Sequence, residues 1–194
     1  PPPAAPAAAE KKAPGRPKKI DPDLFVAVIP DSDPDPRDFA WVNNPAARSL
    51  HVYKDATGRP LFAVMRCADR TPRVMAFGAK PGENQRWSIL SHDKLKAALT
   101  PLLSEAGFAR FPLYNERLVA GRREDIVVFA TDEIAADEIT RSVNGVVAVT
   151  CMGGQREIGK TSLASVLDRQ IVVIPRVGIN AVADARAINA AIHK

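Results

Sequence analysis

The sequence lacks the residues and segments that would assign it to a membrane, disulfide-bonded or metal-binding class. Its two cysteines and three histidines lie far apart, without the short spacings of a metal site. The longest apolar runs, such as IVVFA and VVAVTCM, are far shorter than the roughly 20 residues that cross a bilayer, and no secretory signal opens the chain. We therefore expect a soluble, cytoplasmic protein with packed, reduced thiols, no bound metal and no membrane partner.

Positive charge is in excess, and much of it lies at the start of the chain. The net charge is +5, and the opening letters PPPAAPAAAEKKAPGRPKKI carry five cations against one acid. With few apolar side chains to bury, residues 1–36 are predicted to form a disordered, basic, Pro/Ala-rich linker. The letters PGRPKK resemble an AT-hook core, which implies DNA binding through Arg16, Lys18 and Lys19. A solubilising linker is the alternative, and we prefer it.

Residues 37–120 have the pattern of a β-rich domain. The segments HVYKD, PLFAVMRCA and RVMAFGAK are separated by turn residues, which predicts an antiparallel meander. These expected strands are 51–55, 60–68 and 73–80. Residues 93–105 have helical periodicity, with Pro101 expected to kink or split the helix, and a short helix is expected at 114–119.

Residues 121–194 alternate between apolar strands and helices. The expected strands are 126–130, 146–152 and 171–175, and the expected helices are 132–143, 162–168 and 179–194. Continuous apolar strands separated by helices predict a parallel sheet covered on both faces. The fold class predicted for the whole chain is therefore α+β, with a β-rich part followed by a three-layer α/β domain.

The segment GGQREIGKTS matches the phosphate-binding P-loop pattern. The matching residues are Gly154, Gly159, Lys160 and Thr161, and a working P-loop would bind ATP and Mg²⁺. The next strand, however, is followed by Arg176 where a metal-binding acid is needed. The alternative, which we prefer, is a Gly-Gly turn with Thr161 or Ser162 capping a helix at 162–168.

The order of elements carries a second resemblance. The stretch RFPLYNERLVAGRREDIVVFATDEIAADEITRSVNGVVAVTCMGG, followed by TSLASVLDRQIVVIPRVG, resembles the Toprim region of primase and primase-helicase proteins of phages, plasmids and integrated elements. The Gly-Gly turn and the strand ending in proline fall where that family has them. The resemblance covers about residues 50–178 and implies a Toprim-like sheet. Because Toprim domains normally continue into a further strand, we expect a truncated version here.

The resemblance also implies that the catalytic acids are missing. Toprim enzymes use a Glu as general acid/base and an Asp-x-Asp pair to hold magnesium. Matching TDEIAAD to the family motif places Thr131 at the catalytic Glu and leaves Glu133 as a retained acid, while Arg176 and Gly178 stand at the two aspartates. We expect Asp132 and Glu133 to stabilise the following helix by lying at its positive end, rather than to rebuild an acidic site. The chain is therefore predicted to be catalytically inactive and without a cofactor.

Three functions remain open at this point. The preferred one is an inactive Toprim-like module of a DNA-replication or mobile-element protein, binding DNA or RNA through Arg156, Lys160 and Arg176 at the carboxyl ends of the parallel strands. The second is a protein-interaction or structural module with protein partners in a larger assembly. The third is a P-loop NTPase.

Overall fold

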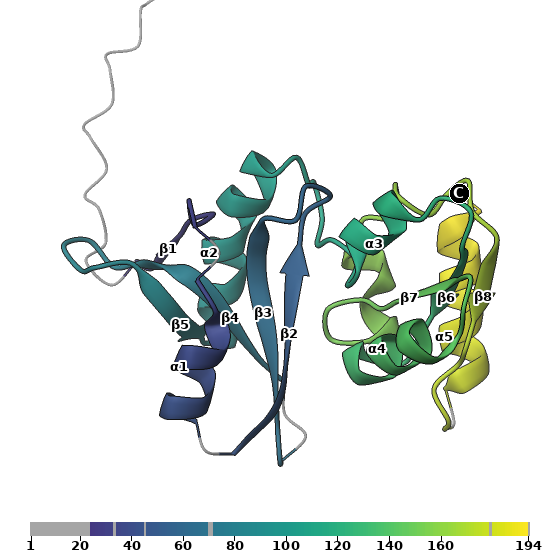
Figure 1. Ribbon diagram of the computed structural model, residues 1–194, viewed down its shortest axis with the longest axis horizontal. Coiled ribbons are helices and arrows are strands. Elements are labelled where there is room, and N and C mark those ends of the chain that lie inside the picture. Colours follow the sequence, from purple (N-terminus) through teal and green to yellow (C-terminus); the bar gives the residue numbers. More distant parts are fainter. Residues whose placement is uncertain (1–23, 33, 45, 70–71, 179, 194) are drawn as a thin grey trace, which may run out of the picture.

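The structure is a computed structural model, and it describes residues 24–32, 34–44, 46–69, 72–178 and 180–193. It contains an antiparallel sheet and a separate three-stranded parallel sheet with helices, so the predicted mixed α+β class is confirmed (Figure 1). Arg16, Lys18 and Lys19 lie outside the described residues, and their role stays a prediction.

The antiparallel sheet contains the predicted meander. Its strands are β1 (Val26–Ala27), β2 (Ala47–Lys54), β3 (Pro60–Cys67), β4 (Pro72–Ala79) and β5 (Arg86–Leu90). They are ordered β1-β4-β3-β2, with β5 also paired to β4. Because side chains alternate along a strand, Tyr53, Phe62 and Val64 face one cluster of buried residues and Met65 faces another.

Three elements of this part were not predicted. β1 and β5 are short strands, and α1 (Pro36–Asn43) is a helix at the point where the sequence analysis divided the linker from the β-rich domain. Asp35 caps α1 by accepting a hydrogen bond from the backbone N–H of Arg37, and Pro36 occupies the first turn. An Asp-Pro pair is a recognised helix start, so this signal was available in the sequence.

α2 (His92–Glu105) is one helix through Pro101, so of the predicted kink or split the split does not occur. Proline removes a hydrogen bond to the carbonyl four residues earlier, here that of Ala97. Both Pro101 and Ala97 are exposed, so water can solvate that carbonyl. The opposite face of the helix carries Ala98, Leu99 and Leu102, which are buried against the antiparallel sheet and hold the helix together.

The parallel sheet has the order β7-β6-β8. Its strands are β6 (Ile126–Phe129), β7 (Val146–Val149) and β8 (Ile171–Val173), and its helices are α3 (Glu116–Gly121), α4 (Glu133–Ser142) and α5 (Ala181–Ile192). One face of β6 and β7 packs with Ala136 of α4, and the other packs with Val119 of α3 and Ile188 of α5. All three predicted strands are present, each somewhat shorter than expected.

The predicted helix at 162–168 is wrong. That segment forms turns, and a short 3₁₀ helix, η1 (Gln155–Lys160), lies over the P-loop letters instead. Thr161 makes a parallel bridge with Phe111, and the backbone N–H of Ser162 donates to the Phe111 carbonyl at 2.7 Å. These contacts hold the backbone extended where a helix would have to begin.

The two sheets share a hydrophobic core. Tyr53 and Phe62 of the antiparallel sheet belong to the same buried cluster as Tyr114, Val128 and Ala136 of the parallel part. In Figure 1, β2 is the strand of the antiparallel sheet drawn nearest the parallel part. This packing places the polar side chains of β2 and β3 against α4.

Candidate functional site

The carboxyl ends of β6 and β8 are joined by the side chain of Gln155. Its Nε2 donates to the Ile174 carbonyl at 2.6 Å and lies 3.4 and 3.3 Å from the carbonyls of Phe129 and Ala130. Its Oε1 accepts from the backbone N–H of Arg176 at 3.3 Å. Gln155 is only 4% exposed. A neutral amide, which has both donors and an acceptor, thus satisfies backbone groups of both strand ends.

Gly154 allows this arrangement. Its φ of 94° lies in a region that residues with a side chain rarely adopt, and an added Cβ would stand 3.5 Å from the carbonyl oxygen of Thr131. The chain can therefore turn sharply after Cys151 and direct Gln155 back under the strand ends. Sequence analysis missed Gln155, although a polar residue directly after a Gly-Gly turn was a usable signal.

The two predicted arginines lie together at this end of the sheet. Arg156 and Arg176 line an open depression of ≈ 500 Å³ with Gly178, Asn180 and Asp184. The Arg156 Nε lies 3.6 Å from the Asp184 carboxylate in the first turn of α5, and the Arg156 side chain remains 61% exposed. Lys160 does not line this depression. Its Nζ lies 2.7 Å from Glu157 Oε2 instead.

The P-loop residues do not form a phosphate cradle. Thr161 is 2% exposed, and its hydroxyl donates to the Glu157 carbonyl while its N–H donates to the Ile158 carbonyl. A phosphate loop requires free backbone N–H groups at a helix start and a hydroxyl that can reach a metal. Gly154 here precedes the 3₁₀ helix η1 and Gly159 lies within it, with no α-helix directly after Thr161. The arrangement does not fit ATP with magnesium.

The positions that correspond to the Toprim acids do not fit magnesium either. Thr131 and Arg176 follow the carboxyl ends of β6 and β8, and between these ends lies the Gln155 amide rather than a carboxylate. Magnesium prefers carboxylate and water oxygens, and a guanidinium repels it. Among the residues that the structure describes, no group of three or more His, Cys, Asp or Glu side chains could hold a metal ion.

Acids are instead found at the start of α4. Asp132 is the N-cap, and it accepts a hydrogen bond from the backbone N–H of Ala135 at 2.9 Å. Glu133 is fully buried and forms an ion pair with Arg66 of β3, while the Tyr53 hydroxyl donates to Glu133 Oε1 at 2.9 Å. Burial, together with the Glu133 charge, raises the pKa of Tyr53 well above its usual value, so this hydroxyl stays a donor.

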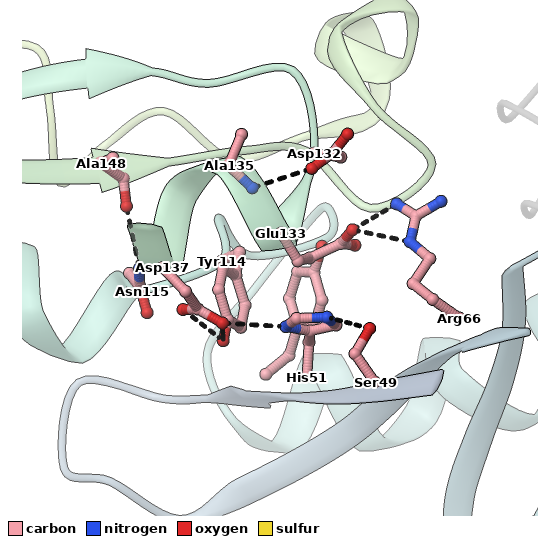
Figure 2. A network of polar contacts seen from close by, with 11 residues as sticks. Ser49, His51, Arg66, Tyr114, Asn115, Asp132, Glu133, Ala135, Asp137 and Ala148 are labelled. Carbon is pink, nitrogen blue, oxygen red and sulfur yellow. Dashed lines mark hydrogen bonds and ion pairs between the residues drawn. The ribbon is translucent and has the colours of Figure 1, made fainter. Parts of the chain in front are cut away.

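A second chain of polar contacts lies beside this pair, as Figure 2 shows. Asp137 of α4 accepts a hydrogen bond from the Tyr114 hydroxyl at 2.9 Å and lies 3.1 Å from His51 Nδ1. The other ring nitrogen, His51 Nε2, lies 2.9 Å from Ser49 Oγ. His51 is 4% exposed. Burial and the Asp137 charge raise the pKa of Tyr114, so it too donates.

The sequence analysis did not predict this network. It placed His51 among scattered histidines, but β2 presents Ser49, His51 and Tyr53 on one face because residues two apart in a strand share a face. The partners come from α4, 80 residues or more away along the chain. The available signal was the S-x-H-x-Y alternation, but its partners could not be identified without the packing of the two sheets.

The structure therefore defines a mixed α+β protein with two polar regions, one at the parallel strand ends and one between the sheets. Comparisons with protein-family models, curated proteins and solved structures give no match. Within the described residues, no helix is both long and apolar enough to cross a membrane. Cys67 and Cys151 are free and buried, which confirms that both thiols are packed, and burial raises the pKa of Cys151 to about 11.

Proposed function

We propose that the chain is a Toprim-like module, catalytically inactive in phosphoryl transfer, that binds nucleic acid within a DNA-replication or mobile-element protein. The observation that carries this proposal is the shared depression of Arg156 and Arg176 at the carboxyl ends of the parallel strands. In α/β sheets this edge is the common place for ligands. Two exposed guanidinium groups there suit the phosphates of a nucleic-acid backbone.

The chemistry of the strand ends supports binding without catalysis. The Gln155 amide occupies the space between β6 and β8 and bonds to the backbone of both strand ends. Phosphoryl transfer needs clustered carboxylates that hold a hard cation. An arginine-lined surface can hold a phosphodiester in place but cannot supply that cation site.

The experiment measures the salt dependence of DNA binding by the full chain. Fluorescence anisotropy with a short labelled duplex gives the dissociation constant over a series of salt concentrations. Each phosphate neutralised contributes about −0.9 to the slope of log K against log salt. Replacing Arg156 and Arg176 with alanine should therefore weaken binding and reduce the size of the slope by about 1.8 for duplex DNA.

The matched control is the double variant Arg86→Ala/Arg141→Ala. It removes the same charge from side chains that are 68% and 76% exposed and lie outside the depression, and it should keep most of the affinity and the slope. A third variant, with Arg16, Lys18 and Lys19 changed to alanine, measures the contribution of the basic N-terminal segment. The proposal fails if the Arg156/Arg176 variant binds DNA as the unmodified chain does.

A protein-binding role is the second candidate, and exposed apolar side chains favour it. Val172 and Ile174 at β8 are 45% and 41% exposed, and Val177 beyond the strand is 99% exposed. Exposed apolar groups that lie close together are typical of protein-protein contacts. This candidate predicts no salt-dependent DNA affinity. It also predicts self-association or partner binding that Val172→Lys/Val177→Lys abolishes in sedimentation velocity experiments.

A further inference from the structure

Ser49, His51 and Asp137 form a linear chain of hydrogen bonds. The Ser49 Oγ lies 2.9 Å from His51 Nε2, and His51 Nδ1 lies 3.1 Å from Asp137 Oδ2. Both distances are hydrogen-bond distances. They are typical of a nucleophile bonded to a general base that a third group orients. Figure 2 shows the His51 ring between the Ser49 hydroxyl and the Asp137 carboxylate. The three side chains thus have the connectivity of a Ser-His-Asp triad.

The carboxylate fixes which ring nitrogen carries the proton. Ionised Asp137 can only accept hydrogen bonds, and it already accepts one from the Tyr114 hydroxyl. In its neutral form the His51 ring therefore donates from Nδ1, which leaves Nε2 free to accept the Ser49 proton. Tyr114 also contacts the His51 ring edge to face, with ring centroids 5.6 Å apart. These contacts hold the ring in the orientation that a general base needs.

The reacting end of the triad is accessible, and a cation lies beside it. Ser49 is only partly buried, whereas His51 is almost fully covered. Arg66 is the direct cross-strand partner of Ser49, and directly opposed side chains on one sheet face are neighbours. Its Nε and Nη2 contact Glu133.

We propose that Ser49, His51 and Asp137 form a nucleophilic site that cleaves small, activated carboxylic esters. Ser49 Oγ forms a bond to the carbonyl carbon, His51 Nε2 takes the hydroxyl proton, and the alkoxide leaves with that proton as an alcohol. Water then attacks the acyl-serine, and its proton passes through Nε2 to Ser49 as the acyl bond breaks and the carboxylic acid is released. This activity is separate from the proposed nucleic-acid binding, since none of these residues lines the basic depression.

The test uses two probes with the full chain. A fluorophosphonate reacts with an activated serine by forming an oxygen-phosphorus bond and releasing fluoride, and mass spectrometry locates the modified residue. p-Nitrophenyl acetate reports turnover. We expect fluorophosphonate modification at Ser49, and we expect Ser49→Ala to abolish it. His51→Gln should slow modification by about 100-fold or more, because general-base assistance contributes roughly that much.

Two further variants separate catalysis from folding. Ser104→Ala removes an exposed hydroxyl at the end of α2 and should leave both reactions unchanged. Asp137→Asn keeps the size of the side chain but removes its charge, so it should slow the reaction at Ser49. The circular dichroism spectrum of this variant should match that of the unmodified chain. The proposal is overturned if Ser49 in the unmodified chain carries no phosphonyl group. It is equally overturned if His51→Gln, folded by circular dichroism, reacts at the original rate.

Discussion

The two polar regions of the molecule use charge in opposite ways. At the carboxyl ends of β6 and β8 the side chains are a neutral amide and two exposed arginines, whereas between the sheets two carboxylates, Glu133 and Asp137, are paired with donors. Both carboxylates lie in the TDEIAAD letters that the sequence analysis compared with a catalytic motif. The difference teaches that an acid retained in a motif can serve the packing of two sheets, while the strand ends, where the sequence analysis expected the acids to be replaced, carry an amide and two arginines.

The largest effect is expected from Glu133→Ala, which breaks the buried pair between the sheets. Arg66, only 18% exposed, is then left without its carboxylate, and the Tyr53 hydroxyl loses its acceptor. Loss of one partner of a buried ion pair costs about 3–5 kcal/mol, so urea unfolding should show a large drop in stability. The double variant Arg66→Met/Glu133→Leu should recover part of it, because no unpaired charge remains. A Glu133→Ala chain as stable as the unmodified one would contradict the role of this pair.

A smaller loss is expected from Gln155→Ala at the strand ends. The variant leaves the Ile174 carbonyl and the Arg176 N–H without their side-chain partner. Because Ile174 and Arg176 are exposed residues, the loss is that of an ordinary hydrogen bond, about 0.5–1.5 kcal/mol, which urea unfolding can measure. Gln170→Ala is the matched control, since Gln170 is exposed and its loss should change stability by about 0.5 kcal/mol or less. Equal stabilities of the two variants would mean that the Gln155 bonds do not hold the strand ends.

The smallest effect is expected from Lys160→Ala, which tests the P-loop letters. Lys160 is 72% exposed and pairs with Glu157 on the surface of η1. Surface pairs of this kind contribute about 0–1 kcal/mol, so thermal unfolding should barely change. Isothermal titration calorimetry should detect no ATP binding before or after the substitution. ATP binding that disappears in Lys160→Ala would instead restore the NTPase interpretation.

The sequence was sufficient to predict the helices and strands whose apolar pattern agrees with their burial in the fold. The apolar runs IVVF and VVAV form parallel strands as predicted, and the β2–β4 meander follows its turns. The errors lie where tertiary contacts overrule the local pattern. Residues 162–168 are held extended at their start by Phe111, and α2 continues through the exposed Pro101 because its opposite face is buried against the antiparallel sheet.

The candidate site residues also divide into those that the sequence could predict and those that depend on tertiary contacts. Arg156 and Arg176 could be predicted to lie together, because the carboxyl ends of parallel strands meet at one edge of a sheet. Lys160 could not be separated from them without knowing that η1 turns it toward Glu157. The Ser49, His51 and Asp137 chain was beyond sequence reasoning, since it depends on how β2 packs against a helix from the other half of the chain.

The Gln155 side chain has a consequence for the motion of the parallel sheet. Within the part of the chain that the structure describes, β8 has three residues and one neighbouring strand, β6. The Gln155 amide adds one more attachment just beyond β8 and fixes it to η1. Local opening of β8 must then release η1 as well, so amide protons in these two elements should exchange with solvent as one unit, faster than those of β6 at the centre of the sheet.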